Sequence, residues 1–494
     1  MIFNNNFIDC ELVSTQLTDS TKIIGEKFKV VDKEVYRFLG ISYASAPVGD
    51  LRFKKPAPVD SYGDTDVYNA TQMPSPCINY LNGVDPSEMP WSSPLPGDED
   101  CLYLNIWSPN ISGDITKKLY PVMVWIYGGA FQTGSIDLDL YDGQTLATTG
   151  DVVVVTFNYR TGVFGLFYDG SDEAPGNLVL HDQRMALQWV HNNIQKFGGD
   201  PQKVTLFGES AGSISVGIHL LSPESSNLFQ RAILQSGSPY HNIGGLPSEV
   251  ALKQSKLIAK DANCLTPQEV IDLNCMRRMS SNQIIAIYKD IYTRGIALQL
   301  IFGDEISQRH PIHALDRRLV NVTDVLIGTN RNEGSSILFM GVPDMFSRRA
   351  PINITKTYAI QFIKAMSESW WLGALSDHQF LQITEYYMSA IDEDDYVSVR
   401  QSLVDIIGDS LFICPSVYLA ESLSQINGSK VFYYQFTHIK HFGNHWGQWM
   451  GSPHFDEIQY VFGLPLRYPH RYSEPEMQLS MNLMKSWSSF ARNG

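Results

Sequence analysis

A serine between two glycines is the residue whose setting most clearly indicates chemistry. Ser210 lies in the segment Gly208-Glu-Ser-Ala-Gly212, after an apolar strand-like stretch and before a helix-like one. A Gly-x-Ser-x-Gly turn between a strand and a helix lifts the serine hydroxyl clear of the sheet, and its glycines leave room for the neighbouring elements. The pattern predicts a nucleophilic serine, and it becomes specific only with an acid, a histidine and an oxyanion hole in the right order.

Glu333 and His454 are the predicted partners of this serine. Glu333 follows the apolar stretch 325–328, and His454 lies in a loop before another apolar segment. In the order serine, acid, histidine, the imidazole takes the serine proton and the carboxylate orients the imidazole. The predicted chemistry is therefore acyl transfer through a covalent intermediate on Ser210.

The oxyanion that forms in such a reaction requires backbone N–H donors. Gly128 and Gly129 follow the apolar stretch 122–127, and their small size lets the main chain approach a substrate. Together with the N–H of Ala211, next to the serine, they are the predicted oxyanion hole.

The elements that must position these residues alternate between strand and helix patterns. Apolar, β-branched runs predict strands at 121–127, 151–157, 204–207, 232–235, 325–328 and 431–436, and helical periodicity predicts helices at 182–195 and 213–221. This alternation predicts an α/β fold with a large, mostly parallel central sheet and helices on both faces. The candidate residues all follow predicted strands, where α/β active sites form. No linker or repeat divides residues 1–494, so one domain is expected.

The charge and the apolar runs of the chain limit the kinds of partner that it can bind. With 37 Lys and Arg against 52 Asp and Glu, the net charge of −15 disfavours nucleic acid and anionic membranes and would attract a cationic substrate. No apolar run approaches about 18 residues, so no membrane span is predicted. Residues 1–20 lack the apolar core of a signal peptide, which leaves a cytosolic protein or a mature secreted one.

The cysteines and sequons favour the secreted alternative. Cys77 and Cys101 enclose one polar loop and Cys264 and Cys275 another, as in the disulfide-bonded surface loops of secreted proteins, while Cys10 and Cys414 are left over. Asn-x-Ser/Thr motifs, which carry little weight in a chain of this composition, occur at Asn69, Asn110, Asn321, Asn353 and Asn427.

A histidine cluster raises the alternative of a metal site. His438, His441 and His445 have helical spacing, but Gly443 and Gly447 interrupt the helix and no cysteine or carboxylate completes a ligand set. Neither a metal nor another cofactor is predicted.

The chain resembles the type-B carboxylesterase/cholinesterase family over nearly its whole length. The resemblance rests on Phe38-Leu-Gly-Ile-Ser-Tyr-Ala44, Glu99-Asp-Cys-Leu-Tyr-Leu-Asn-Ile-Trp107, Asp182-Gln-Arg-Met-Ala-Leu-Gln-Trp-Val190, Phe197-Gly-Gly-Asp-Pro201 and Ile233-Leu-Gln-Ser-Gly237. It implies the α/β-hydrolase fold and hydrolysis of a small-molecule ester. By position, Ser210, Glu333 and His454 match the family's triad, and Gly128, Gly129 and Ala211 match its oxyanion donors. Two family disulfides match Cys77–Cys101 and Cys264–Cys275.

Within the family the chain is most similar to cholinesterases. Trp91 stands ten residues before Cys101, the position of the tryptophan that stacks on choline, and Glu209 resembles a second choline-site residue. A tryptophan face attracts quaternary ammonium groups. The resemblance also implies Phe131, Tyr141 and Trp449 as substrate-binding residues and a cationic ester as substrate.

Other positions depart from the cholinesterase pattern. Ser336 and Ile337 stand where an aromatic residue follows the acid, Ile243 replaces an acyl-pocket tryptophan, and Asp456 replaces a choline-site tyrosine. Residues 293–301 contain no phenylalanine. A roomier acyl pocket and a less complete choline site are expected. The sequence ends at Gly494, before the family's C-terminal segment with the expected partner of Cys414, and the oligomeric state stays open.

These departures keep two alternatives open. One is a general carboxylesterase for neutral lipid, hormone or xenobiotic esters. The other is a non-catalytic adhesion or binding protein on the same fold, against which the intact triad argues.

Overall fold

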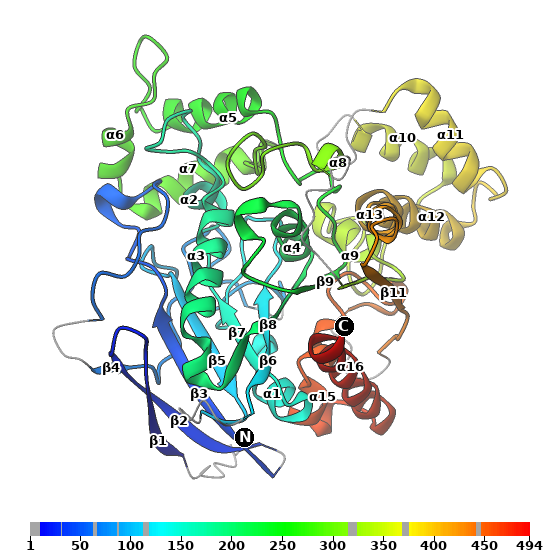
Figure 1. Cartoon of the computed structure of the whole chain (residues 1–494). Coiled ribbons are helices and arrows are strands. Elements are labelled where there is room, and N and C mark those ends of the chain that lie inside the picture. Colours follow the sequence, from blue (N-terminus) through cyan, green and yellow to red (C-terminus); the bar gives the residue numbers. More distant parts are fainter. Residues whose placement is uncertain are drawn as a thin grey trace, which may run out of the picture.

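Figure 1 shows the computed structural model of the chain, in which a central twisted sheet is surrounded by helices. The structure describes residues 10–30, 32–62, 67–85, 88–111, 118–314, 324–367, 375–440 and 446–494.

The sheet contains both parallel and antiparallel strands. Its spatial order in the described residues is β1-β2-β3-β5-β7-β6-β8-β9-β10-β11, with β4 paired to β2. The strands are β1 (Glu11–Gln16), β2 (Lys22–Val30), β3 (Lys33–Ser42), β4 (Val67–Asn69), β5 (Tyr103–Ser108), β6 (Tyr120–Ile126), β7 (Val153–Phe157), β8 (Gly199–Glu209), β9 (Arg231–Gln235), β10 (Asp324–Asn330) and β11 (Lys430–Phe436).

From β7 to β11 all neighbouring strands are parallel, as predicted, because each crosses to the next through helical segments. Strands β1, β2, β3, β5 and β7 pair antiparallel, which the sequence prediction missed. Short connections such as that between β2 and β3 allow hairpin pairing, which needs no helical crossover. The buried central strands are rich in valine and isoleucine, as expected for a sheet covered on both faces.

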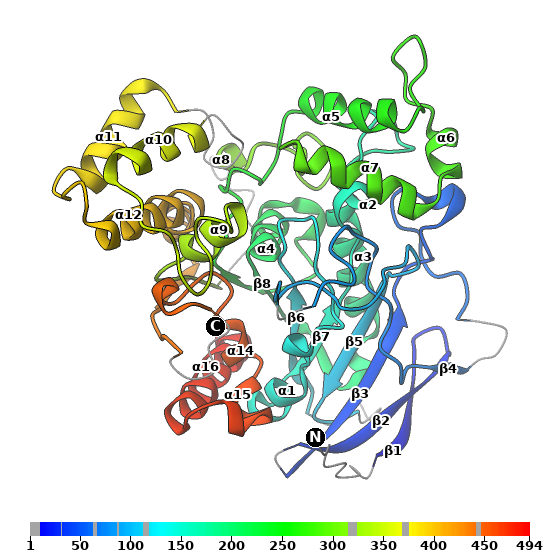
Figure 2. The same cartoon turned by 180° about the vertical axis from the view of Figure 1, so that it is seen from behind.

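Helices cover both faces of the sheet. Helices α3 and α4 pack against β8, while α1 and the C-terminal α16 pack together, α1 against β3, β5 and β7 and α16 against β6 and β8 (Figures 1 and 2). The helices are α1 (Gln144–Gly150), α2 (Gly162–Leu166), α3 (Leu178–Asn193), α4 (Ala211–Leu221), α5 (Ser248–Asp261), α6 (Leu273–Arg278), α7 (Ser281–Thr293), α8 (Pro311–Ala314), α9 (Gly334–Gly341), α10 (Lys356–Ser367), α11 (Asp377–Met388), α12 (Tyr396–Gly408), α13 (Cys414–Ser424), α14 (Ile458–Val461), α15 (Leu464–Arg467) and α16 (Glu474–Asn493).

A second hydrophobic cluster lies beside the sheet. It joins buried residues of α9, α10, α11 and α12, and these helices stand to one side of the sheet in Figures 1 and 2. Helices α12 and α13 are joined by the π-helical turn Asp409–Ile413, so residues 396–424 form one helical stretch. By length and composition this stretch could cross a membrane, although the sequence prediction found no such segment. Because 61% of its apolar window is buried inside the protein, we interpret it as a core helix.

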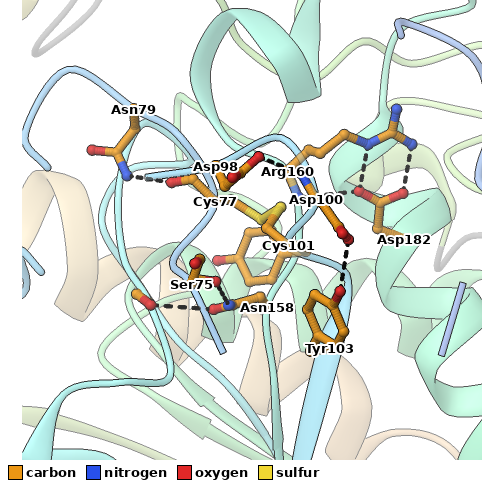
Figure 3. Close-up of a disulfide and its surroundings, with 12 residues drawn as sticks. Ser75, Cys77, Asn79, Asp98, Asp100, Cys101, Tyr103, Asn158, Arg160 and Asp182 are labelled. Carbon is orange, nitrogen blue, oxygen red and sulfur yellow. Dashed lines mark hydrogen bonds and ion pairs between the residues drawn. A yellow bond between two sulfur atoms is a disulfide. The ribbon is translucent and has the colours of Figure 1, made fainter. Parts of the chain in front are cut away.

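Both predicted disulfides are present, Cys77–Cys101 and Cys264–Cys275, and Cys10 and Cys414 are free thiols. Figure 3 shows the first disulfide, which closes the loop that carries Trp91. Next to it, Asn158 Nδ2 donates to the Ser75 carbonyl at 3.0 Å. The segment that leads into the loop is therefore anchored to the residue that follows β7.

Candidate active site

The serine lies at a sharp turn between β8 and α4. Ser210 has φ +56° and ψ −124°, a conformation that costs a non-glycine residue about 1–3 kcal/mol. Its N–H donates to the Gln235 carbonyl at 2.9 Å, which ties the turn to β9. A Cβ on Gly212 would collide with the Ile126 carbonyl, and one on Gly208 would meet it at 2.7 Å. The two glycines of the motif are thus required by the close approach of β6.

Glu333 and His454 come together although 121 residues separate them in sequence. His454 Nδ1 lies 2.6 Å from Glu333 Oε2, and the other carboxylate oxygen accepts the Asn330 N–H at 2.6 Å. The Phe412 ring lies 4.1 Å from the imidazole centroid, with 30° between the planes. A fully buried carboxylate, a backbone donor and an aromatic ring therefore hold the imidazole in one orientation.

The other nitrogen of the imidazole faces a second carboxylate. His454 Nε2 lies 3.0 Å from Glu209 Oε1, and no hydrogen bond joins Ser210 to His454 among the described residues. Burial lowers the pKa of His454, but Glu209 and Glu333 outweigh it and raise the value to about 10. Burial raises the pKa of Glu209, and the proximity of His454 opposes that rise. Such hydrogen bonds are often loose in a free enzyme and tighten once substrate is bound.

The loop after β6 supplies backbone donors near the serine. Gly129, Ala130 and Phe131 have φ values of +114°, +55° and +63°, a strained run that turns the chain sharply. Gly129 and Ala130 line the cavity that contains Ser210. Ala211, at the first position of α4, has an N–H without a helical acceptor.

Gly128 packs directly against the residues of the serine turn. A Cβ on Gly128 would lie 2.7 Å from the Glu209 carbonyl and 2.8 Å from Ser210 Cβ, so this glycine allows close packing behind the nucleophile. It does not line the described cavity, whereas Ala130, which the prediction omitted, does. Which of these neighbouring residues lines the cavity depends on the conformation of the turn. The sequence Gly-Gly-Ala does not reveal that conformation.

Ser210, Glu209 and His454 open into one cavity of about 530 Å³. A cavity of this size suits a small ligand. The remaining lining residues are Tyr80, Leu81, Met89, Trp91, Gly129, Ala130, Gln132, Thr133, Ile214, His241, Asn242, Ile243, Lys289, Tyr292, Thr293, Gly295, Ile337, Met340, Gly341, Leu411, Phe412 and Phe455.

One end of this cavity is aromatic. Trp91, which is 7% exposed, has Phe455 edge-to-face at 5.4 Å and Trp446 stacked at 6.3 Å. Phe455 directly follows His454 and has φ +84°, an outlier for a bulky residue. The sequence prediction named Trp91 and Glu209 at this end but missed Phe455, because its contact with Trp91 joins segments far apart in the chain.

Of the four departures from the cholinesterase pattern, Asp456 and Ser336 lie outside the cavity wall, whereas Ile337 and Ile243 line it. Asp456 is buried, accepts hydrogen bonds from Gln459 and Trp446, and burial raises its pKa to about 7. It therefore orients Trp446 and does not face a ligand. Ser336 is fully buried and does not line the cavity, which Ile337 does.

Three predicted substrate-binding residues do not line the cavity. Tyr141 is fully buried between Trp125 and Phe462, because its ring fills the core beneath β6. Phe131 is also in the core, and its carbonyl accepts the Gly162 N–H. Trp449 donates to the Ser347 carbonyl at 3.0 Å and its ring packs on Phe346 and Arg400. The side chains of these three residues therefore do not line the described cavity.

Another set of lining residues comes from segments that are far apart in the chain and that the sequence analysis did not bring together. His241 and Ile243 follow β9, and Leu411 and Phe412 come from the π-helical turn after α12. Only Thr293 and Gly295 of the stretch 293–301 line the described cavity. Phe412, from a distant helix, therefore adds an aromatic ring to the cavity wall, to which residues 293–301 contribute none.

The part of the histidine cluster that the structure describes forms no metal site. His438 Nε2 lies 3.2 Å from Glu476 Oε1, while His441 and His445 lie outside the described residues. Among the residues that the structure describes, no group of three potential ligands converges.

Comparison with known proteins identifies relatives of this arrangement. The model of the carboxylesterase family matches residues 9–494. The chain is 37% identical to acetylcholinesterase-1 of Trittame loki over 94% of this chain and 83% of that protein. It is 38% identical to the acetylcholinesterase of Bungarus fasciatus and 36% identical to the cholinesterase of Mus musculus, in each case over 97% of this chain and 78% of the relative.

Proposed function

The chain belongs to the carboxylesterase family and is a serine ester hydrolase similar to cholinesterases, and we propose that it hydrolyses choline esters with Ser210, Glu333 and His454. The observation that carries the choice of substrate is the position of Trp91 and Glu209 in the cavity of the serine. An indole face and a carboxylate together suit a quaternary ammonium group.

The proposed reaction begins with a shift of the His454 imidazole from Glu209 to Ser210. His454 takes the serine proton as Ser210 Oγ attacks the ester carbonyl, and backbone N–H groups of Gly129, Ala130 and Ala211 stabilise the oxyanion. Collapse of the tetrahedral intermediate breaks the bond to the alcohol, which leaves with the proton from His454. Water, deprotonated by His454, then cleaves the acyl-enzyme and releases the acid.

Glu333 supports this cycle without reacting. Its hydrogen bond to Nδ1, at 2.6 Å, keeps the proton on that nitrogen, so that Nε2 is the nitrogen that exchanges protons. When His454 becomes an imidazolium, the buried carboxylate stabilises its charge.

A general carboxylesterase for neutral esters is the second candidate, and one observation favours it. Lys289 lines the same cavity and brings a positive charge that opposes a cationic substrate. The side chain is exposed, and charges exposed to water are screened more strongly than buried ones such as Glu209. This difference favours the cationic ester over the neutral one.

Two esters that differ only in charge test the choice. Acetylthiocholine and 3,3-dimethylbutyl thioacetate have the same shape, but only the first is cationic. We expect kcat/KM to be about 10-fold or more higher for the cationic ester, since a desolvated cation–π contact contributes up to about 2 kcal/mol. Equal values, or a preference for the neutral ester, would favour the general carboxylesterase.

We also propose that the protein acts outside the cell. The support is its two disulfides and the exposed sequons at Asn69, Asn353 and Asn427. Enzymatic removal of N-linked glycans from protein made by its native cells should raise its electrophoretic mobility. Unchanged mobility together with reduced cysteines at both bridges would favour a cytosolic protein.

A further inference from the structure

His241 is a buried titratable residue that the proposed reaction does not use. It follows β9 through Ser236 and Gly237, and a Cβ on Gly237 would collide with the Ser210 carbonyl, so this loop begins directly behind the nucleophile. The side chain is 8% exposed, and it lines the cavity of Ser210. Its exposed part therefore faces the space in which the substrate reacts.

The hydrogen bonds of His241 determine which nitrogen carries the proton. The Ile243 N–H donates to His241 Nδ1 at 3.1 Å, so Nδ1 must be an acceptor. A neutral imidazole then carries its proton on Nε2. Among the described residues no acceptor is recorded for that N–H, and burial, with a smaller effect of nearby His454, lowers the pKa of His241 to about 3. The ring is therefore a neutral donor with one unused N–H.

This donor lies among apolar side chains, and its ring contact differs from those of Trp91. The His241 ring lies 5.3 Å from Phe412, whose ring stacks on His454, and Ile243 and Leu411 line the same end. Trp91 contacts Phe455 and Trp446 instead. If the alcohol part of the ester occupies the Trp91 end, as the proposed function requires, the acyl chain extends toward His241.

We propose that His241 is a specificity-determining residue that donates its Nε2–H to an acceptor atom within the acyl chain of the substrate. The preferred substrates are then esters whose acyl chain carries an ether, hydroxyl or carbonyl oxygen beyond the ester carbonyl. A plain alkyl chain of equal length excludes water from this N–H and offers no acceptor in its place, which weakens binding. This inference rests on the proposed function, because that function assigns the acyl chain to this end.

The experiment compares butyryl and methoxyacetyl esters of thiocholine, which differ by one CH₂ replaced with an ether oxygen. Each kcat/KM is divided by the rate constant of hydroxide-catalysed hydrolysis, which removes the difference in intrinsic reactivity. We expect the full-length enzyme to prefer the methoxyacetyl ester by about 10-fold, as for one hydrogen bond of about 1.4 kcal/mol. His241→Leu should abolish the preference, because it removes the donor that favours the methoxyacetyl ester. His241→Gln, which retains an N–H donor, should keep part of the preference.

Ile243→Val is the matched control. It changes the apolar wall of the same end and should alter kcat/KM for both esters alike. An equal normalised rate for the two esters in the wild type would overturn the role of His241. So would a His241→Leu variant that keeps the preference, or one that loses both activities in proportion while His241→Gln restores both. If the wild type hydrolyses neither ester, the proposed choline-ester function fails, and the inference fails with it.

Discussion

His454 Nε2 lies 3.0 Å from Glu209 Oε1 in the free protein, so the imidazole is held between two buried carboxylates. The nitrogen that must accept the serine proton is thus occupied by Glu209 before substrate binds. A cationic substrate that approaches Glu209 would compete for this carboxylate and release the imidazole for Ser210. We therefore expect Glu209 to connect recognition of the cation with activation of the base.

Glu209→Gln should shift the pH dependence of the reaction. Burial opposes protonation of His454, but the two carboxylates raise its pKa to about 10, and below its pKa a histidine is charged and cannot act as a base. Removing one carboxylate lowers the pKa, so the acid limb of kcat/KM for a neutral ester should move to lower pH by about 1 unit or more. Glu209→Asp, which keeps the charge, is the control. An unchanged limb, or a shift to higher pH, would contradict the role given to Glu209.

Ser210→Ala should lower kcat by about 10⁴-fold, because it removes the nucleophile and leaves the rest of the site. The melting temperature should stay within a few degrees of the wild-type value. Ser213→Ala is a matched control, since the Ser213 hydroxyl donates to the Gly237 carbonyl and does not line the described cavity. An organophosphate should label one serine, and label at another residue would contradict the assignment.

Trp91→Ala should raise KM for acetylthiocholine by about 10-fold or more and leave KM for the uncharged isostere nearly unchanged, because a cation–π contact acts only on the charged ester. Trp449→Ala is the control, since Trp449 lies outside the described cavity wall and should not change the ratio of the two esters. An equal effect of Trp91→Ala on both esters would show that the indole serves packing.

Loss of the Cys77–Cys101 disulfide should impair cation recognition more than hydrolysis itself. The bond, shown in Figure 3, joins two cysteines with a sequence separation of 24, and the loop that it closes carries Trp91. Its removal should lower the free energy of unfolding by up to about 3 kcal/mol and raise KM for the charged ester alone. Replacing Cys264 and Cys275, whose loop does not line the described cavity, should affect stability without changing that ratio.

Asp182→Ala should reduce the free energy of unfolding by about 3–5 kcal/mol, because it leaves a charged guanidinium buried without its partner. Asp182 is fully buried and pairs with Arg160 through contacts of 2.6 and 2.8 Å (Figure 3). Denaturant unfolding measures the change. Lys33→Ala, which breaks an ion pair between half-exposed side chains, should cost less than about 1 kcal/mol. A small effect of Asp182→Ala would show that water or another group compensates for the lost carboxylate.

The sequence alone determined those parts of the site whose conformation depends on residues adjacent in the chain. The run from β8 through Ser210 to α4 depends on adjacent residues, since an apolar strand, two glycines and a helix-forming stretch specify the turn. The parallel strands β6 to β11 were predictable for the same reason, because apolar runs separated by helical patterns require parallel crossovers. The antiparallel N-terminal strands were not, because strand periodicity does not specify the partner.

Only the tertiary structure decided which side chains surround the serine. Phe412, Phe455 and His241 come from segments far apart in the chain, and their places in the cavity wall depend on how helices pack over the sheet. The same packing places Tyr141 in the core and Trp449 against Arg400, although their residue types suit a binding site equally well. Aromatic side chains serve both core packing and substrate binding, since in either place they bury a large apolar surface. A residue type and its spacing therefore predicted the reaction, whereas the shape of the substrate site required the packed structure.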